Sequence, residues 1–363
     1  MLGATSPLTG VPAASCARVD NGALSWFKHI NDEGGVNGRR ITWKILDDAY
    51  DLSRAGANAR KLVDGDYFAI FGGCGSIQPP AIVPVAARAK VPYLFPMAQV
   101  PDLYLPTNPY TYAFSPSWAS MFHGVIPWAL KEKGIGSVAV VFAENAGIDK
   151  SVQAVKSATV EAGGTYAGEQ VAPAATSDWT PIILKLKQQK PDYVVLNLSV
   201  EVALKFQQAA EDQGFEPKKS YINAISLMGD AYVRALKTGP NSTKLDGKVI
   251  SAYQVATPDD PANAECVAAT KKYAPDFAPD GNLMAGCNSA RWMVEALKRT
   301  GKDLTRENFM KTLGRISDDQ LSPGAVPASF SADDHLGPDS MYVYELEGGK
   351  YVKKGTVPLD SSM

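Results

Sequence analysis

The segment Phe71-Gly-Gly-Cys-Gly-Ser-Ile-Gln-Pro-Pro80 decides how the first part of this chain is interpreted. The apolar run before it, Tyr67–Phe71, has the length and composition of a buried strand. A glycine-rich turn follows, and prolines then open a run, Pro80–Ala89, that has the character of a helix. A strand, a tight turn and a helix in this order form one repeating unit of a parallel α/β sheet.

The same alternation continues in both directions from this segment. In the first part of the chain we expect strands at residues 1–5, 41–46, 67–71 and 91–95, and helices at 14–31, 53–63 and 80–89. After a stretch punctuated by prolines, we expect strands at 138–142, 166–171, 193–198, 221–224 and 249–253, and helices at 148–162, 180–189, 201–213 and 229–236. Helices at 262–273, 284–299 and 305–313 follow, and then a hairpin made by 341–346 and 351–356.

This order predicts an α/β fold with two doubly wound, parallel-sheet domains. A chain of 363 residues is too long for one ordinary core. We assign residues 1–117 and 251–327 to a first lobe, and residues 118–250 and 328–363 to a second lobe. In such sheets the carboxyl ends of the strands line a crevice, so we expect a ligand site between the lobes.

Composition argues against several classes of function. The chain is 45% hydrophobic and 20% charged, and its 36 Lys and Arg nearly balance its 38 Asp and Glu. No excess of positive charge is therefore present to bind nucleic acid or an anionic membrane. The longest apolar runs, such as 193–198, are too short to span a bilayer. No signal peptide precedes the first expected strand, so either a signal peptide is absent from this chain because it was removed or the protein is cytoplasmic.

Four cysteines leave two interpretations open. None forms a CxxC pair or has the spacing of a zinc site. They are either buried small apolar residues or two disulfides formed in an oxidising compartment. In the second interpretation Cys16 pairs with Cys74, because both follow strands expected to be neighbours, and Cys266 pairs with Cys287 in the next helix.

Two loops at the expected carboxyl edge of the first sheet are the candidate ligand site. The first lies at the start of a helix, where backbone N–H groups and the helix dipole favour an anion or a carboxylate, and a serine hydroxyl can add a bond. The second follows the strand at 91–95. The alternatives are that Ser76 only caps its helix and that the second loop is an ordinary connection. The candidate residues are Gly75, Ser76, Ile77, Ala98, Gln99 and Val100.

Motifs for catalysis, metals and cofactors are missing from the sequence. The histidines, His29, His123 and His335, stand apart in two helices and a polar loop, outside any HExxH pattern. The glycines at 72–75 make neither GxxxxGK[ST] nor GxGxxG, so a phosphate or dinucleotide is the weaker interpretation. We therefore expect a protein that is not an enzyme, with no cofactor and no bound metal.

An ordered series of short motifs covers essentially the whole chain. In order and spacing this series resembles the branched-chain amino acid and amide binding proteins, which are type I periplasmic binding proteins of ABC importers. The resemblance implies two lobes that are joined by three crossover segments and close over a ligand. It also implies a secreted or lipid-anchored protein, which we expect to be a monomer, with the permease subunits of an ABC transporter as partners. The motifs are Gly3–Gly10, Ile30–Arg39, Leu46–Asp48, Lys61–Val63, Gly72–Ser76, Val91–Leu94 and Phe330–His335.

The resemblance also implies ligand contacts, and here the second lobe departs from the amino-acid pattern. The first-lobe segments would hold a carboxylate and an amine, and the second lobe would contribute Ala146, Ser199, and Ile225 or Ser226. Amino-acid binders often have aromatic residues at the first two positions and an acidic residue near the third. An ammonium buried without such a partner costs roughly several kcal/mol. We therefore predict an amine-free aromatic carboxylate, such as a benzoate or cinnamate. The alternative is a branched-chain amino acid, with Asp230 as the charge partner.

Proteins of other classes share this architecture. A transcriptional regulator would need a helix-turn-helix before the first strand, and that strand begins at residue 1. A dehydrogenase would need a complete dinucleotide fingerprint. A cytoplasmic sensor of small amides with the same fold remains an alternative.

Overall fold

The computed structural model describes the chain except residues 11, 145–147, 174–175, 224, 229 and 239–243. The chain forms two compact units. Unit 1 comprises Met1–Ser117, Gln254–Ser340 and Ser361–Met363. Unit 2 comprises Trp118–Tyr253 and Met341–Asp360.

The boundary after Ser117 lies where the sequence analysis placed it, but the later boundaries differ. Residues 251–253 end a strand of unit 2, and residues 328–340 belong to unit 1 rather than to the second lobe. Phe330 explains the second difference, because its ring lies 6.0 Å from that of Phe95 and 6.1 Å from that of Trp292 in unit 1. Residues 361–363 also belong to unit 1, where the Met363 carbonyl accepts bonds from the hydroxyls of Tyr104 and Ser117.

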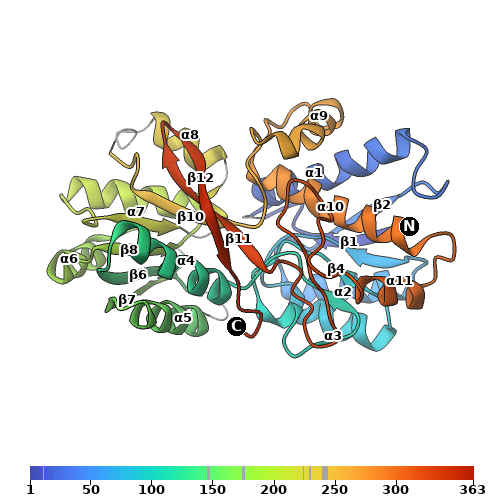
Figure 1. The fold of residues 1–363 in the computed structure, drawn as a ribbon, viewed down its shortest axis with the longest axis horizontal. Helices are drawn as coiled ribbons and strands as arrows, with labels where there is room; N and C mark the ends of the chain where they lie inside the picture. Colours follow the sequence, from blue (N-terminus) through green and yellow to red (C-terminus); the bar gives the residue numbers. More distant parts are fainter. Residues whose placement is uncertain (11, 145–147, 174–175, 224, 229, 239–243) are drawn as a thin grey trace. The chain divides into compact units, whose positions relative to one another are not determined.

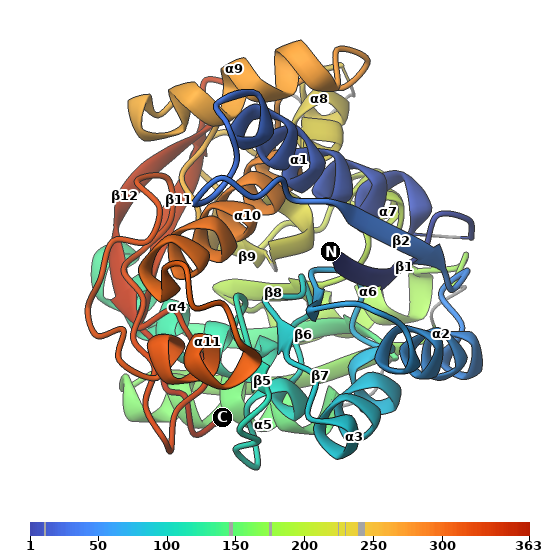
Figure 2. The same cartoon turned by 90° about the vertical axis from the view of Figure 1, so that its right-hand side faces the viewer.

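Unit 1 contains a parallel five-stranded sheet in the order β2-β1-β3-β4-β5. The predicted alternation is confirmed, and β5 is an addition that the sequence pattern did not indicate. Figure 2 shows α1 and α10 on one face of this sheet and α2 and α3 on the other. The strands are β1 (Leu2–Ser6), β2 (Trp43–Asp47), β3 (Ala69–Phe71), β4 (Tyr93–Leu94) and β5 (Thr111–Tyr112). The helices are α1 (Ala13–Asp32), α2 (Leu52–Asp64), α3 (Pro79–Ala89), α9 (Ala264–Tyr273), α10 (Gly281–Thr300) and α11 (Arg306–Leu313), with short 3-10 turns at Pro101–Leu103 and Pro261–Asn263.

Two glycines allow α1 and α10 to pack closely. A Cβ at Gly22 of α1 would collide with the carbonyl of Leu283, and a Cβ at Gly286 of α10 would collide with the carbonyl of Val19. The helix backbones therefore touch, and α10 is buried along most of its length. This close packing fixes α1 against α10 on one face of the sheet.

Unit 2 contains a seven-stranded sheet in the order β12-β11-β10-β9-β8-β6-β7. Strands β6 to β10 are parallel, as predicted, whereas β11 runs antiparallel to β10, so the sheet is mixed rather than purely parallel. Figure 1 shows α4 and α5 on one face and α7 and α8 on the other. The strands are β6 (Ser137–Ala143), β7 (Thr165–Ala172), β8 (Tyr193–Asn197), β9 (Ser220–Asn223), β10 (Val249–Tyr253), β11 (Ser340–Glu347) and β12 (Lys350–Pro358). The helices are α4 (Trp118–Lys133), α5 (Ile148–Glu161), α6 (Thr180–Gln189), α7 (Val200–Asp212) and α8 (Asp230–Thr238), with a 3-10 turn, η2, at Ile225–Met228.

Among the residues that the structure describes, every helix is too short or too polar to cross a membrane.

Candidate functional site

The two predicted ligand segments of unit 1 lie side by side. Cys74, in the turn after β3, pairs with Met97, in the loop after β4, as an isolated parallel bridge. The Gly75 N–H donates to the Met97 carbonyl at 3.0 Å, and the Met97 N–H donates to the Gly73 carbonyl at 2.9 Å. These bonds continue the pairing of β3 and β4 beyond the strand ends. The polar residues that follow are therefore held at fixed positions.

Ser76 connects the two segments and does not cap a helix, contrary to the alternative interpretation. Helix α3 begins at Pro79, so Gln78 occupies the cap position, and it makes no side-chain cap bond. The Ser76 hydroxyl instead accepts a hydrogen bond of 3.1 Å from the Gln99 N–H. A hydroxyl that accepts in this way still has its own proton to donate. Ser76 can therefore also act as a donor.

Only glycine suits two positions in the turn. Gly73 and Gly75 have φ angles of +88° and +119°, which residues with a Cβ rarely adopt. A Cβ at Gly73 would also collide with the carbonyl oxygen of Thr5 on β1. The turn thus brings its backbone against β1.

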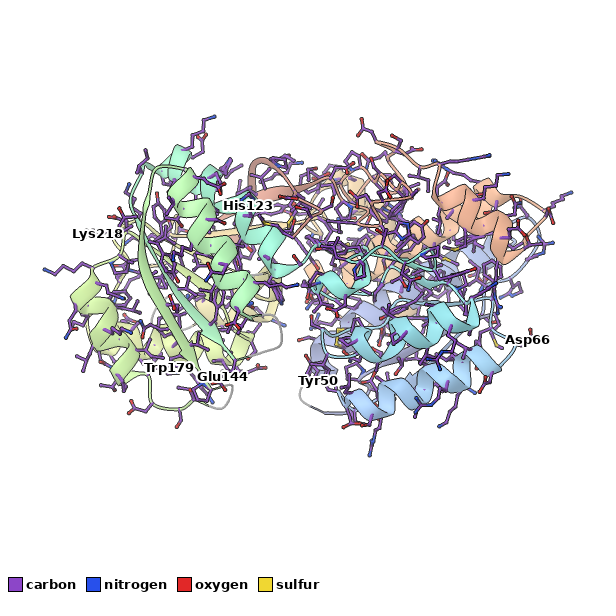
Figure 3. All side chains as sticks on the ribbon, turned by 90° about the horizontal axis from the view of Figure 1, so that it is seen from below. Tyr50, Asp66, His123, Glu144, Trp179 and Lys218 are labelled. Atoms are coloured by element: carbon purple, nitrogen blue, oxygen red, sulfur yellow. A yellow bond between two sulfur atoms is a disulfide. The ribbon has the colours of Figure 1, made fainter. Side chains whose placement is uncertain are left out.

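Tyr50 is a further candidate site residue that the sequence analysis did not include. It follows β2 with a φ angle of +59°, and its N–H donates to Asp48 Oδ1 at 2.9 Å (Figure 3). Burial raises the pKa of the phenol, and a hydrogen bond from the Ser76 backbone N–H lowers it less. The phenol is therefore neutral near pH 7 and keeps a proton that it can donate.

The side chains of two other predicted site residues lie in the core. Ala98 and Val100 are buried in a cluster with Tyr93 and Tyr104. Only the backbone at these positions can meet a ligand. Ile77 and Gln99 are half-buried, and their side chains stay candidates.

Two carboxyl groups, those of Asp48 and Asp20, are buried near this edge of the sheet. Asp48 is fully buried and accepts from the Thr5 hydroxyl at 2.8 Å and from Gln78 Nε2 at 3.4 Å. Asp20 of α1 is 4% exposed, and burial raises its pKa to about 7, while the Ser6 hydroxyl lowers it less. The donors found at Ser76 and Tyr50 are uncharged.

Unit 2 arranges its predicted residues differently. Ser199 is exposed and caps α7, since its hydroxyl accepts from the Val202 N–H at 3.4 Å. Ala146 lies outside the described residues, and Ile225 and Ser226 lie in η2, where only the backbone is described.

Glu144 is a further residue that the sequence analysis missed. It directly follows β6, its side chain is exposed, and its N–H donates to the Ala172 carbonyl at 2.9 Å. It lies at the carboxyl edge of the sheet in unit 2, and Figure 3 labels it there. Its place after an apolar strand was the available signal.

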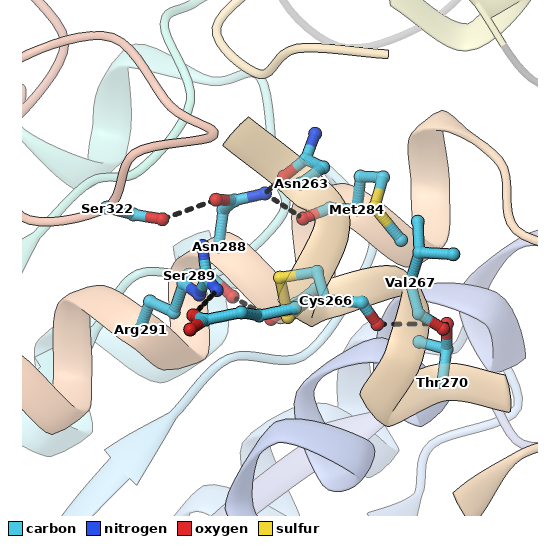
Figure 4. Close-up of a disulfide and its surroundings, with 12 residues drawn as sticks. Asn263, Cys266, Val267, Thr270, Met284, Asn288, Ser289, Arg291 and Ser322 are labelled. Atoms are coloured by element: carbon cyan, nitrogen blue, oxygen red, sulfur yellow. Dashed lines mark hydrogen bonds and ion pairs between the residues drawn. A yellow bond between two sulfur atoms is a disulfide. The ribbon is translucent and has the colours of Figure 1, made fainter. Parts of the chain in front are cut away.

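Both predicted cysteine pairs are disulfides. Cys16–Cys74 joins α1 to the turn that precedes Ser76, across 58 positions of sequence. Cys266–Cys287 joins α9 to α10, across 21 positions (Figure 4). The second disulfide lies among a polar set in which Asn288 Nδ2 donates to Asn263 Oδ1 at 2.9 Å. The first disulfide is therefore part of the candidate site, and the second stabilises the helices behind it.

The histidines lie far apart in sequence and have different surroundings. His335 is buried, and its Nδ1 lies 2.9 Å from the Thr111 carbonyl. Burial lowers the pKa of His335, so the ring is neutral near pH 7. His29 and His123 lie near the carboxylates of Glu33 and Glu161, each at 3.4 Å. Each histidine ring therefore has a polar neighbour within the structure.

Comparison with known proteins agrees with this architecture. Residues 1–350 match the family described as "Periplasmic binding protein". A curated relative, "Leu/Ile/Val-binding protein homolog 7" of Brucella suis, is 26% identical over 317 residues, which cover 82% of this chain and 76% of the relative.

Two solved structures have the same fold. One is a branched-chain amino acid ABC transporter protein from Thermus thermophilus with bound valine, with a TM-score of 0.85, 18% identity, and coverage of 99% of this chain and 96% of that one. The other is a solute-binding protein of an ABC transporter from Rhodopseudomonas palustris in complex with 3,4-dihydroxybenzoic acid, with a TM-score of 0.81, 23% identity, and coverage of 99% and 98%. Since the family match extends over nearly the whole chain, this protein belongs to the periplasmic binding protein family.

Proposed function

We propose that this protein captures a small carboxylate for an ABC importer. The observation that carries the proposal is the pair of neutral donors in unit 1. The Ser76 hydroxyl accepts the Gln99 N–H, and the neutral Tyr50 phenol has its ring against the same turn, so both hydroxyls have a proton to donate to a ligand. A carboxylate accepts two such bonds, and bonds to a charged acceptor are the stronger kind.

The ligands named for the two structural neighbours fit this chemistry. Valine and 3,4-dihydroxybenzoic acid differ in their amine and in their ring, and they share a carboxylate. We propose that unit 1 binds this shared end. In this proposal the unit 2 positions Ala146, Ser199, Ile225 and Ser226 face the variable end of the ligand.

For the variable end we propose an amine-free aromatic acid, such as a benzoate or cinnamate. Two small residues, Ala146 and Ser199, stand where amino-acid binders often have aromatic side chains, and they would leave room for a ring. The buried Asp20 and Asp48 side chains do not favour an ammonium, because the pKa values of both are raised and Asp48 already accepts three hydrogen bonds.

The partners we propose are the permease subunits of an ABC transporter, with the receptor acting as a monomer outside the cytoplasm. Two disulfides support an extracytoplasmic location, because disulfides persist mainly in oxidising compartments.

A calorimetric panel of ligands tests the proposal on the whole protein. The acids are benzoate, 3,4-dihydroxybenzoate and cinnamate, the amino acids are leucine and valine, and benzamide is the control without a carboxylate. We expect micromolar or tighter binding of at least one aromatic acid and none of benzamide. Tight binding of leucine with no binding of the aromatic acids would refute the proposal of an aromatic ligand. Binding of benzamide alone would refute the proposal that the protein recognises a carboxylate.

One observation favours a branched-chain amino acid as the second candidate. Glu144 places an exposed carboxylate at the carboxyl edge of the sheet in unit 2, where it could pair with a ligand ammonium. In that case Glu144→Gln would weaken the binding of leucine by about 10-fold or more. If an aromatic acid is the ligand, the same substitution would leave its affinity unchanged or improve it, because a like charge is removed.

A further inference from the structure

The Met97 thioether, next to the ligand segment, receives an unusual set of polar contacts. The Ser115 hydroxyl donates to Met97 Sδ at 3.0 Å, and the side-chain amide of Gln99 lies 3.6 Å from the same sulfur. Gln254 Nε2 lies 3.9 Å from it. A thioether is a weak acceptor, and methionine is usually used to fill apolar cores. Three polar side chains around one sulfur therefore indicate a specific arrangement.

Ser115 and Gln254 form a buried pair behind this sulfur. Gln254 Nε2 donates to Ser115 Oγ at 2.8 Å, and both side chains are fully buried. Among the described residues, Gln254 Oε1 has no hydrogen-bond partner. Burying an acceptor without a donor costs free energy.

The backbone of Met97 transmits this arrangement to the ligand segment. Its N–H and carbonyl are both bonded to the turn at Gly73–Gly75, and the Gln99 N–H binds Ser76 Oγ two residues later. The Met97 backbone is thus bonded to the turn at Gly73–Gly75 and lies two residues from the amide that binds the Ser76 hydroxyl.

The pair also joins two points where the chain passes between the units. Gln254 is the first residue of unit 1 after unit 2, and Ser115 lies three residues before Trp118, where unit 2 begins. The hydrogen bond between them spans 139 positions of sequence. Both crossing segments thus contact the same methionine.

We propose that Ser115 and Gln254 are positioning residues, which set the affinity for the carboxylate ligand through Met97 without touching that ligand. This inference rests on the proposed function for its ligand. In this inference the two segments that pass between the units help to hold the hydrogen bond between the Gln99 N–H and the Ser76 hydroxyl in place.

The first test compares the substitutions Ser115→Ala and Gln254→Met in the wild-type and Met97→Leu backgrounds. We expect each to raise the Kd of the tightest acid in the panel by about 5- to 20-fold. In the Met97→Leu background, where the acceptor is gone, each should have less than a twofold further effect. Ser115→Thr keeps the hydroxyl and should bind within about threefold of wild type.

Ser322→Ala is the matched control for lost stability. Ser322 is also a fully buried serine of unit 1, and its hydroxyl donates to Asn288 rather than to Met97 (Figure 4). We expect this variant to lower Tm and to leave Kd unchanged. If Ser115→Ala and Gln254→Met change Kd no more than Ser322→Ala does, or if their effects add fully to that of Met97→Leu, the inference is wrong.

The second test needs no ligand. Hydrogen exchange of the Gly75 and Gln99 amides should accelerate at least fivefold in Ser115→Ala and Gln254→Met, but not in Ser322→Ala. Unchanged exchange would overturn the inference whatever the ligand. If wild type binds none of the acids while exchange still accelerates, the proposed function fails and the positioning of the loop by Met97 stands.

Discussion

The carboxyl edges of the two sheets are built from similar elements but are stabilised in different ways. In unit 1 the loops after two strands bond to each other, because the Ser76 hydroxyl after β3 accepts the Gln99 N–H after β4, and the ring of Tyr50 after β2 lies against the same turn. In unit 2, Ser199 after β8 bonds to the first turn of its own helix. Bonds between loops fix a binding surface, whereas a cap fixes only a helix end. In the proposed function, the fixed surface of unit 1 binds the carboxylate.

The edges also differ in the groups they bury. Unit 1 buries the carboxyl groups of Asp20 and Asp48, whereas unit 2 buries the amides of Asn197 and Asn223 at the ends of β8 and β9. Carboxyl groups titrate and amides do not, so the stability of unit 1 should depend on pH through its own edge.

The largest effect we predict concerns Asp20. Its pKa is about 7 in the folded protein, against an ordinary value of 3.8, so the folded chain holds a proton that the unfolded chain has released. Between about pH 4 and pH 7 the free energy of unfolding should therefore fall as pH rises, by roughly 4 kcal/mol in total. The groups facing this carboxyl are the Ser6 hydroxyl and the Asp48 carboxylate, and the latter raises the pKa. Urea unfolding at several pH values measures the slope.

The substitution Asp20→Asn isolates this contribution. An amide cannot ionise, so the part of the slope that comes from Asp20 should disappear, while the exposed Asp66→Asn control should keep the wild-type slope. Identical slopes for wild type and Asp20→Asn would contradict a raised pKa at Asp20. They would also remove one difference between the two edges.

Removing the Cys16–Cys74 disulfide should have the next largest effect. It closes the longer loop, so Cys16→Ala with Cys74→Ala should cost about 4 kcal/mol of stability, against about 3 kcal/mol for the pair Cys266→Ala and Cys287→Ala. Only the first pair borders the turn before Ser76, so only its loss should also raise the ligand Kd. Equal changes in Kd for both pairs would indicate a general loss of structure instead.

The substitution Ser76→Ala tests the unit 1 edge directly. It removes one hydrogen bond to a charged acceptor, which contributes about 1.5 to 3 kcal/mol, so Kd should rise by about 10- to 100-fold. Tm should change little, because Ser76 caps no helix. Ser53→Ala, at an exposed position of α2, is the control. A normal Kd for Ser76→Ala would remove Ser76 from the site.

Short-range patterns in the sequence predict most strands and helices of the fold, but not β5 or the later boundaries between the units. The strand and helix periodicities and the turn at Gly72–Gly75 are local, and they place the two ligand segments at one sheet edge. The bonds that orient the site are not local. Ser76 and Gln99 are 23 positions apart, and Ser115 and Gln254 are 139 positions apart, so no pattern in a short window indicates either pair.

Tyr50 could not be predicted as a site residue for a related reason. Its φ angle of +59° is unusual for a side chain with a ring, and the acidic residues before it resemble an ordinary turn. What directs the phenol to Ser76 is tertiary packing. The alternative that Ser76 caps a helix was wrong for the same kind of reason, since the Gln99 amide binds its hydroxyl instead.

The substitution Ser199→Ala should have the smallest effect on binding and gives the closest comparison with Ser76→Ala. Loss of the cap of α7 should cost about 1 kcal/mol of stability. Because the Ser199 oxygen is engaged by its own helix, Kd should change by no more than about threefold. Calorimetry and thermal unfolding on the same two variants measure both quantities. An exchange of the two outcomes, with Ser199→Ala weakening binding and Ser76→Ala weakening only stability, would place carboxylate recognition in unit 2. Threefold or smaller changes in Kd at both serines would leave Tyr50 and the backbone of unit 1 as the recognition surface, and Tyr50→Phe would then be the deciding variant.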